Sequence, residues 1–423
     1  GIRRSTGQHP GGIVVLPHGE DINSFTPIQH PANDMTTDII TTHFDYHSID
    51  HNLLKLDILG HDDPTMIKTL EELINSDAMD NKYDGVNNVF KATDIPLDDP
   101  GVMGLFAGTE VLGITPEDID GCPLGCLGVP EFGTDFAMQM LIDTKPKYFS
   151  DLVRIAGLSH GTDVWLGNAQ TLIEEGKATI STAICTRDDI MIYLISMGVE
   201  SSLAFTIMEA VRKGKGLREE WEATMREHNV PEWYIWSCKK IKYMFPKAHA
   251  AAYVMMAWRI AWFKVFKPLA YYAAFFSIRA TAFSYETMCM GRDRLDFYLA
   301  ELRKKGDAAS KKEQDTIKDM RIVQEMYARG LEFMPIDLYR AKANRFQIID
   351  GKLMPALNCI DGMGDKAAEA VVDAAKQGKF LSKDDFRDRT KVSKTVIDLM
   401  DDLGIFGDIP QSNQFSLFDG VIA

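Results

Sequence analysis

Apolar and polar residues alternate most regularly in a short stretch near the N-terminus. Leu54, Leu56 and Ile58 alternate with Lys55 and Asp57. A period of two predicts a β-strand with one buried face. We therefore expect the three apolar side chains to enter a core and the Lys55 and Asp57 side chains to project together from the opposite face.

Longer stretches repeat apolar residues every three or four positions, which predicts helices. Asp63 and Pro64 have the character of an N-cap and a first helical residue. The apolar helix faces that we expect are Met66, Leu70, Leu73 and Ile74; Leu203, Ile207, Met208 and Val211; and Ala250, Tyr253, Val254, Ala257, Ile260 and Ala261. Since helices dominate, the expected fold class is mainly α with a small mixed α/β part.

Turn residues mark the remaining elements. Prolines punctuate residues 79–150, which predicts short helices joined by loops. Alternating apolar residues over 346–349 precede Asp350 and Gly351, a pair typical of a β-hairpin turn. Residues 284–330 alternate charges with few aliphatic side chains, so we expect solvated helices there.

A helix-hairpin-helix pattern occupies residues 356–368. Gly362 and Gly364 allow the tight hairpin, and the amides that open the following helix, which includes Lys366, can hold a backbone phosphate without reading sequence. These three residues are candidate DNA-binding residues. A weaker helical pair over 392–406 predicts a tandem arrangement.

Composition complicates a nucleic-acid interpretation. The 423 residues are 45% hydrophobic, enough for two or three domains, and the formal net charge is −15, which argues against DNA binding on average. Residues 233–285, however, contain no Asp or Glu. Their cations are Lys239, Lys240, Lys242, Lys247, Arg259, Lys264, Lys267 and Arg279, which predicts a basic patch in an acidic protein.

The cysteines and the hydropathy further limit the class of protein to which the chain can belong. Six cysteines in a chain of this length do not form a disulfide framework, and reduced cytosolic thiols are favoured over a zinc site at Cys122 and Cys126. The most apolar region, residues 250–276, is interrupted by charged side chains and a proline, so it is not a membrane span. We expect a cytoplasmic protein.

Candidate chemistry falls at two basic loops and one carboxylate. Arg3 and Arg4 precede a glycine-rich loop, where they could neutralise a phosphate, although turn formation explains the glycines equally. Residues 212–216 stand at the end of a helix. Their cations would suit triphosphate binding, but the helix dipole and an ordinary glycine C-cap explain them equally well. Asp57, near a strand end, suits a metal-borne reaction centre; the alternative is a turn cap or an ion pair with Lys55.

Several segments resemble one family of enzymes. Residues 53–60, Leu-Leu-Lys-Leu-Asp-Ile-Leu-Gly, are similar to the palm strand of C-family bacterial DNA polymerases. Residues 247–253, Lys-Ala-His-Ala-Ala-Ala-Tyr, are nearly the signature of their fingers. Residues 6–12 resemble a palm-associated loop, and residues 158–168 resemble a fingers loop beside the nascent base pair. Together these segments are similar to PolC-type DNA polymerase III alpha subunits over essentially the whole chain.

The resemblance implies roles for individual residues. Asp57 matches one of three aspartates that hold two Mg²⁺ ions for the transfer of a deoxynucleotide from dNTP to a primer 3′ hydroxyl on template DNA. The residues implied at the incoming nucleotide are Arg212, Lys213, Lys215, Lys247, His249 and Lys55. The other two aspartates form an upstream Asp-x-Asp pair in the family, and nothing before Asp57 matches it. Asp118 and Asp120 have the spacing but lie downstream.

The resemblance also implies domains and partners. Residues 1–66 match the end of the palm, 67–335 the fingers, 336–410 the duplex-binding module and 411–423 a flexible tail. In that tail Gln414, Leu417 and Phe418 look like a peptide that binds the beta sliding clamp, and other replisome subunits are further partners. Without an initiator methionine, we expect the C-terminal fragment of a longer polymerase, inactive alone.

Two other functions fit parts of the chain. The hairpin and the tail suffice for a non-catalytic module that binds DNA and tethers it to the clamp, with Asp57 structural. The cations of residues 212–216 would also suit a nucleotide-binding protein unrelated to DNA.

Overall fold

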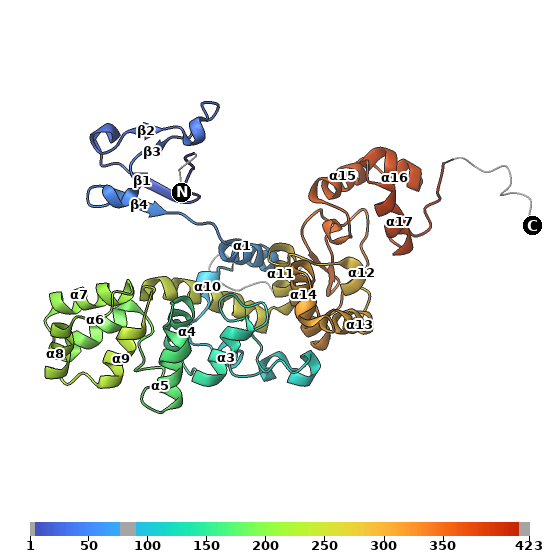
Figure 1. The fold of residues 1–423 in the computed structure, drawn as a ribbon. Coiled ribbons are helices and arrows are strands. Elements are labelled where there is room, and N and C mark those ends of the chain that lie inside the picture. The colour runs from blue at the N-terminus through green and yellow to red at the C-terminus, as the bar shows by residue number, and fades with distance from the viewer. Residues whose placement is uncertain (1–4, 77–89, 414–423) are drawn as a thin grey trace, which may run out of the picture. The chain divides into compact units, whose positions relative to one another are not determined.

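The computed structural model describes residues 5–76 and 90–413 (Figure 1). The chain divides into two compact units, residues 1–62 and 63–423. Short strands form the sheets of the first unit, and α-helices make up most of the second. The expected fold class, mainly α with a small mixed α/β part, is confirmed.

The first unit contains two small antiparallel sheets. Their strands are β1 (Gly12–Val15), β2 (Ile28–Gln29), β3 (Thr41–Thr42) and β4 (Leu54–Asp57). Strand β1 pairs with β4 so that Gly12 faces Asp57 and Val14 faces Lys55. Because residues two apart on a strand share a face, Lys55 and Asp57 project together, as expected, with Nζ 3.3 Å from Oδ1.

The buried face predicted for β4 is wrong. Leu54 and Leu56 are 62% and 44% exposed, and Ile58 beyond the strand is 60% exposed. Their cross-strand neighbours in β1, Val15 and Ile13, are exposed as well. The alternation correctly predicted the strand, but among the described residues of the first unit nothing forms a second layer over this apolar face.

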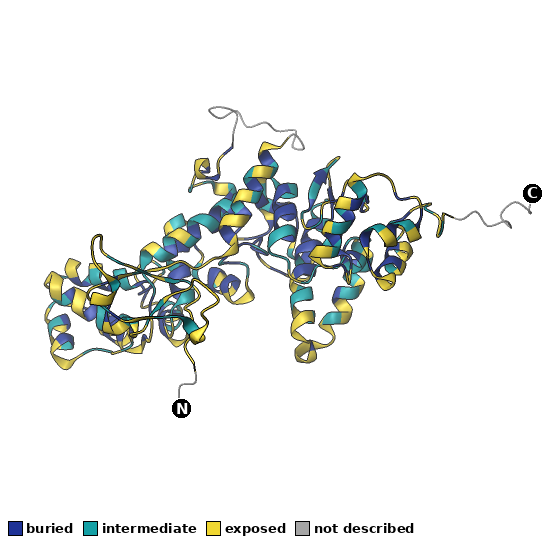
Figure 2. Ribbon diagram, turned by 90° about the horizontal axis from the view of Figure 1, so that it is seen from above, coloured by how far each residue is buried: buried dark blue, intermediate teal, exposed yellow. Residues whose placement is uncertain are grey.

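The second unit is built from helices of very different lengths. They are α1 (Asp62–Asn75), which starts at the boundary, α2 (Pro100–Gly104), α3 (Asp135–Thr144), α4 (Phe149–His160), α5 (Gln170–Glu174), α6 (Arg187–Ser196), α7 (Ser201–Arg212), α8 (Glu219–Glu227), α9 (Glu232–Lys240), α10 (Lys247–Phe266), α11 (Pro268–Ile278), α12 (Tyr285–Met288), α13 (Arg292–Arg303) and α14 (Lys311–Ala328). In several of the longer helices, buried residues lie on one side and exposed residues on the other (Figure 2).

The predicted helix faces are largely confirmed. Met66, Leu70 and Ile74 are buried on α1, and the core side of α7 is the predicted one. Asp63 lies inside the first turn of α1 rather than at its cap, and its carboxylate accepts a hydrogen bond from Arg279 at 2.8 Å. On α10 the predicted face is buried except for Tyr253, which is half-buried.

One cation of the basic patch predicted for residues 233–285 does not lie at the surface. Lys264 on α10 is completely buried, where Nζ donates to the carbonyl oxygens of Gly125 (2.7 Å) and Leu127 (2.6 Å) and pairs with Glu325 at 2.8 Å. The Tyr272 hydroxyl donates to the same carboxylate at 2.6 Å. A window without acidic residues therefore finds its counter-charge on α14, outside the window.

The third sheet and the C-terminal helices follow α14. Strands β5 (Gln347–Ile349) and β6 (Lys352–Met354) are antiparallel, and Asp350 and Gly351 between them both have positive φ. This geometry confirms the predicted hairpin. Helices α15 (Asp365–Lys376), α16 (Lys383–Thr390) and α17 (Lys394–Asp402) follow (Figure 1). A single 3₁₀ turn, Leu357–Cys359, stands where the sequence predicted the first helix of the hairpin motif.

Helix α14 is not the solvated helix that its charges predict. Among its buried residues are Met320, Ile322, Val323 and Met326, and also Asp319, which is 4% exposed. The Asp319 carboxylate accepts hydrogen bonds from the backbone amides of Thr281 (3.1 Å) and Ala282 (2.8 Å). Burial raises the pKa of Asp319 to about 6, against the lowering effect of these two amides.

We expect Asp319 to make stability depend on pH. Its folded-state pKa lies above the ordinary value, so the folded chain holds a proton that the unfolded chain releases, and this contribution is lost as pH rises through about 6. Asp319→Asn retains an oxygen acceptor for both amides and does not ionise. Relative to the parent chain, the variant should gain about 2 kcal/mol of unfolding free energy between pH 4.5 and 7.5, measured by urea denaturation. A constant difference across that range would contradict this assignment.

No helix in residues 5–76 and 90–413 is both long and apolar enough to cross a membrane.

Candidate functional site

Asp57 ends strand β4 and is half exposed. Its Oδ1 lies 3.3 Å from Nζ of Lys55, and the Lys55 ammonium lies over the Tyr46 ring, 4.9 Å from its centroid. The carboxylate is 53% exposed, so it is reachable from solvent and is not a core residue. The structure therefore contains the ion pair that was the alternative explanation of Asp57, in a position that leaves the carboxylate open to a cation.

A pocket of about 570 Å³ lies on the Lys55 side of the first unit. Gly12, Val14, Thr41, Tyr46 and Lys55 are among its lining residues. Glycine at position 12 leaves room for the His9 ring, because a Cβ there would come 2.8 Å from Nδ1 of His9, which accepts from the Gly12 amide at 2.6 Å. At the preceding Gly11 a Cβ would lie 2.5 Å from the Ile58 carbonyl oxygen, so close packing within this unit explains both glycines.

The first unit supplies only part of the ligands that two Mg²⁺ ions would need. Asp57 is a hard oxygen ligand of the kind that Mg²⁺ prefers. Among the described residues, however, no group of three or more His, Cys, Asp or Glu side chains could hold a metal ion. One carboxylate does not make a two-ion site, so the described residues by themselves do not fit the pair of ions.

Three predicted nucleotide-binding cations follow helix α7. Arg212 donates to Glu209 through Nε (2.5 Å) and Nη2 (2.9 Å), and Lys213 pairs with the same carboxylate at 3.2 Å. Gly214, with φ of +71°, ends the helix, and Lys215 beyond it makes no ion pair with another described residue. Glu209 therefore orients two cations at the helix end, and Lys215 remains exposed.

Lys247 and His249 open helix α10 beside this cationic end. The segment before α10 is bonded to α7, because the Met244 amide donates to the Arg212 carbonyl oxygen at 3.3 Å. Gly214 packs so closely against the Lys242 backbone that a Cβ would lie 2.6 Å from the Lys242 oxygen. The structure thus brings the predicted cations of α7 and α10 to one region of the second unit.

The surroundings of these residues include acidic groups that the sequence did not single out. The Lys247 amide donates to Asp188 at 2.6 Å, and its Nζ lies 4.0 Å from Asp189. A carboxylate at a helix N-terminus is favourable because of the helix dipole. Lys247 is therefore anchored through its backbone while its ammonium is only weakly paired.

A half-buried histidine pair was missed as a functional contact. The His160 ring lies 6.1 Å from the His249 ring, and His160 Nε2 lies 2.8 Å from Glu131. His160 Nδ1 faces the Ala156 carbonyl oxygen at 2.6 Å, so both ring nitrogens meet acceptors. The Glu131 hydrogen bond raises the pKa of His160, whereas burial and then His160 lower the pKa of His249.

Glu131 was invisible to sequence reasoning. It falls in the irregular connector of residues 128–134 and has a positive φ of 68°, which is uncommon for a residue with a side chain. Glu131 lies four residues after Leu127, whose carbonyl oxygen accepts a hydrogen bond from Nζ of the buried Lys264. Ser159 lies 3.1 Å from His160 Nδ1, but that nitrogen faces a carbonyl acceptor, so the pair is not the nucleophile and base of a hydrolase.

The hairpin residues are exposed at the start of α15. Gly362 has φ of +85°, Gly364 is the N-cap of α15, and Lys366 in the first turn is exposed. Asp361 and Asp365 flank the glycines, which makes the hairpin less basic than its motif suggested. Arg3, Arg4, Gln414, Leu417 and Phe418 lie outside the described residues.

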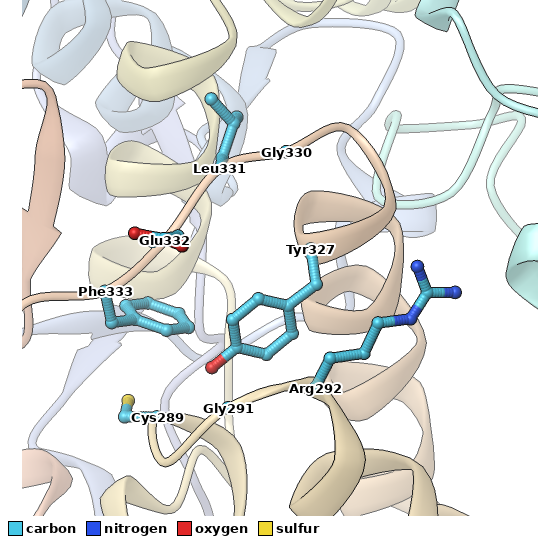
Figure 3. Close-up of a pocket in the computed structure, with 8 residues that line it drawn as sticks. All are labelled: Cys289, Gly291, Arg292, Tyr327, Gly330, Leu331, Glu332 and Phe333. Carbon is cyan, nitrogen blue, oxygen red and sulfur yellow. The ribbon is translucent and has the colours of Figure 1, made fainter.

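Another pocket, of about 370 Å³, contains none of the predicted site residues. Figure 3 shows the Tyr327 ring directed toward Cys289 and Gly291, while the Arg292 guanidinium extends away from Phe333. The Tyr327 hydroxyl donates to the Met288 carbonyl oxygen at 2.7 Å, and Arg292 donates to that of Asp118 at 2.8 Å. These polar groups serve local structure, so the pocket is not a candidate site.

Three family models match the chain in consecutive regions. Residues 1–60 match the bacterial DNA polymerase III alpha NTPase domain, and residues 63–229 match the bacterial DNA polymerase III alpha subunit finger domain. Residues 330–415 match a helix-hairpin-helix motif. The first two matches meet at the boundary between the two structural units.

Curated relatives agree over almost the whole chain. The DNA polymerase III PolC-type proteins of Clostridium perfringens and Caldanaerobacter subterraneus subsp. tengcongensis are each 53% identical over 418 residues, which is 99% of this chain. That of Streptococcus sanguinis is 52% identical over 427 residues. The chain spans only 28%, 29% and 28% of these relatives. With this identity and these matched domains, the chain belongs to the family of PolC-type bacterial DNA polymerase III alpha subunits.

Proposed function

We propose that this chain forms the nucleotide-binding and duplex-binding part of a replicative DNA polymerase. The polymerase transfers a deoxynucleotide from dNTP to a primer 3′ hydroxyl on a DNA template. The single observation that carries this proposal is that the end of α7, at Arg212 and Gly214, contacts residues 242–244, which lead directly into Lys247 and His249. Positive side chains held in place before substrate arrives are what phosphoryl-transfer chemistry requires.

The cations have separable tasks in this proposal. Lys215 and Lys247 are exposed enough to meet the triphosphate, and Arg212 is held by Glu209 in one orientation. Their charge offsets the negative charge that builds on the transferred group and on the leaving pyrophosphate. Burial and then His160 lower the pKa of His249, which favours its neutral ring at the nucleotide, and the hydrogen bond to Glu131 raises the pKa of His160 behind it.

Asp57 is proposed as one ligand of the Mg²⁺ ions, with Lys55 beside it at the nucleotide. When bound, the metal would make the primer hydroxyl a better nucleophile and neutralise the leaving group. Since the described residues supply one carboxylate, the remaining ligands belong to other parts of a complete polymerase. We accordingly expect the 423-residue chain alone to show no primer extension.

Further proposals concern domains and partners. The palm, fingers, duplex-binding and tail divisions at residues 66, 335 and 410 remain predictions, as does cytoplasmic location. Duplex DNA would contact the hairpin at Gly362, Gly364 and Lys366 and the N-terminal Arg3 and Arg4. The beta sliding clamp would bind the tail through Gln414, Leu417 and Phe418, and other replisome subunits complete the assembly.

The cation cluster can be tested in a full-length chimaera. Residues 1–423 replace the matching segment of the Clostridium perfringens relative, and steady-state incorporation on a primed template is measured. Lys247→Ala should weaken dNTP use, seen as kcat/KM, about 10–100-fold, since a hydrogen bond to a charged group contributes about 1.5–3 kcal/mol. Lys239→Ala is the matched control, because Lys239 of α9 already pairs with Glu222 of α8 at 2.7 Å. Equal effects of the two substitutions would overturn the proposed nucleotide site.

A further inference from the structure

A pocket of about 750 Å³ lies between the hairpin and two earlier helices of the same unit. One wall is the hairpin itself, with Asn358, Gly362 and Gly364. The opposite wall comes from residues 281–287 and from helices α13 and α14, including Lys312 and Thr316. This second wall lies between the regions that the finger-domain and helix-hairpin-helix models match.

The face of helix α14 that lines the pocket changes from charged and exposed to apolar and buried. Lys312, Thr316 and Met320 are four residues apart and all line the cavity, so they form one stripe of the helix. Met320 at the bottom is buried, Thr316 is intermediate and Lys312 at the top is exposed. The stripe places a positive charge at the mouth above an apolar floor.

Lys312 differs from its neighbours on the same helix. Lys311 and Lys318 both pair with Asp315, at 2.9 Å and 3.9 Å. Lys312 makes no ion pair with any other residue that the structure describes. An unpaired ammonium at the rim of a cavity is available to an anion, whereas its two neighbours are already compensated.

The hairpin wall offers backbone donors. The amides of Gly364, Asp365 and Lys366 open α15 and make no hydrogen bond to other described groups, which is the usual state of a helix start. Deeper in the cavity, the Thr287 hydroxyl is buried from solvent and has no hydrogen-bond partner among the described residues. The hairpin is therefore the wall that offers open donors, because Gly364 lines the cavity whereas the Thr287 hydroxyl is enclosed by protein.

One carboxylate restricts where an anion can lie. Asp361 lines the pocket, and its Oδ2 accepts a hydrogen bond from the Ser284 hydroxyl at 3.2 Å, which ties the two walls together. The Thr316 hydroxyl donates to the Lys312 carbonyl oxygen at 2.9 Å. The charge available to an anion therefore comes from Lys312.

We propose that this pocket is a two-sided clamp on the sugar-phosphate backbone of duplex DNA. The hairpin amides hold a phosphate from one side, and Lys312 of α14 neutralises it from the other. The inference rests on the proposed function, in which the hairpin binds duplex DNA. It adds helix α14 to the DNA-binding surface and makes the hairpin's position relative to α14 part of the binding site.

The test measures duplex affinity of the 423-residue chain by fluorescence anisotropy as a function of salt. Lys312→Ala should weaken binding about tenfold on duplexes of unrelated sequence, because a phosphate contact reads no bases. It should also reduce the slope of log K against log salt by about 0.9. Lys318→Ala removes the same charge from the same helix but only a paired lysine, so it should change affinity less than twofold.

The outcomes separate this inference from the proposed function. Loss of affinity in Lys366→Ala, with Lys312→Ala equal to Lys318→Ala, would overturn the clamp and leave hairpin binding intact. A parent chain with no duplex affinity would overturn the proposed DNA binding itself. Weaker binding of free dNTP but not of duplex in Lys312→Ala would also overturn the clamp, in favour of a nucleotide pocket. Lys312→Arg should restore the salt slope, which a folding defect would not.

Discussion

In the full-length chimaera, Asp57→Asn is expected to lower nucleotide incorporation at least about 1,000-fold. The substitution keeps the size of the side chain and removes its charge. A metal ion contributes several kcal/mol of charge stabilisation in such reactions, and about 4 kcal/mol corresponds to three orders of magnitude in rate. Single-turnover primer extension isolates the chemical step from DNA release.

Duplex affinity should survive the same substitution. Asp57 is a carboxylate, so its removal cannot weaken a phosphate contact, and anisotropy should show binding equal to or tighter than that of the parent. Asp38→Asn, at an exposed aspartate of the same unit, is the matched control and should retain incorporation. Unchanged incorporation in Asp57→Asn would leave Asp57 as the ion-pair partner of Lys55 and favour the alternative, a non-catalytic module that tethers DNA to the clamp.

The second large effect is expected in the core. Lys264→Met should destabilise the second unit by about 3–5 kcal/mol, because it leaves a buried carboxylate without its charge partner. Glu325 would retain only the Tyr272 hydroxyl, and the carbonyl oxygens of Gly125 and Leu127 would lose their shared donor. Urea denaturation of the 423-residue chain, followed by far-ultraviolet circular dichroism, measures the change.

An exposed ion pair on α14 provides the comparison for this variant. Lys311→Met breaks the pair with Asp315, which is solvent-accessible, so its cost should stay below about 1 kcal/mol. If both substitutions cost the same, the Lys264–Glu325 pair would not be the buried anchor that its geometry indicates. A second variant, Glu325→Gln, should be less damaging than Lys264→Met, because glutamine still accepts from Lys264 and Tyr272.

The buried Lys264–Glu325 pair is also connected to the proposed nucleotide site. Lys264 holds Leu127, and four residues later Glu131 holds His160 against His249. Lys264 therefore anchors the same chain segment that carries Glu131, beside the proposed nucleotide site.

The sequence by itself determined the local elements and the family. Periodicity was sufficient for the existence of the strand at residues 54–57 and for the buried faces of α1 and α7, because apolar spacing follows the repeat of the element. Asp350 and Gly351 determined the hairpin because few residues accept positive φ. The strings around Asp57 and Lys247 were specific enough to identify relatives.

Only the tertiary structure decided which charges work together. In the acid-free window of residues 233–285, Lys264 pairs with Glu325, which is 61 positions away, and Arg279 pairs with Asp63, which is 216 positions away. Local sequence does not encode such partners, since burial depends on what packs from elsewhere. The same reason explains the exposed face of β4, the role of Glu131 beside His160, and the placement of Lys312 opposite the hairpin.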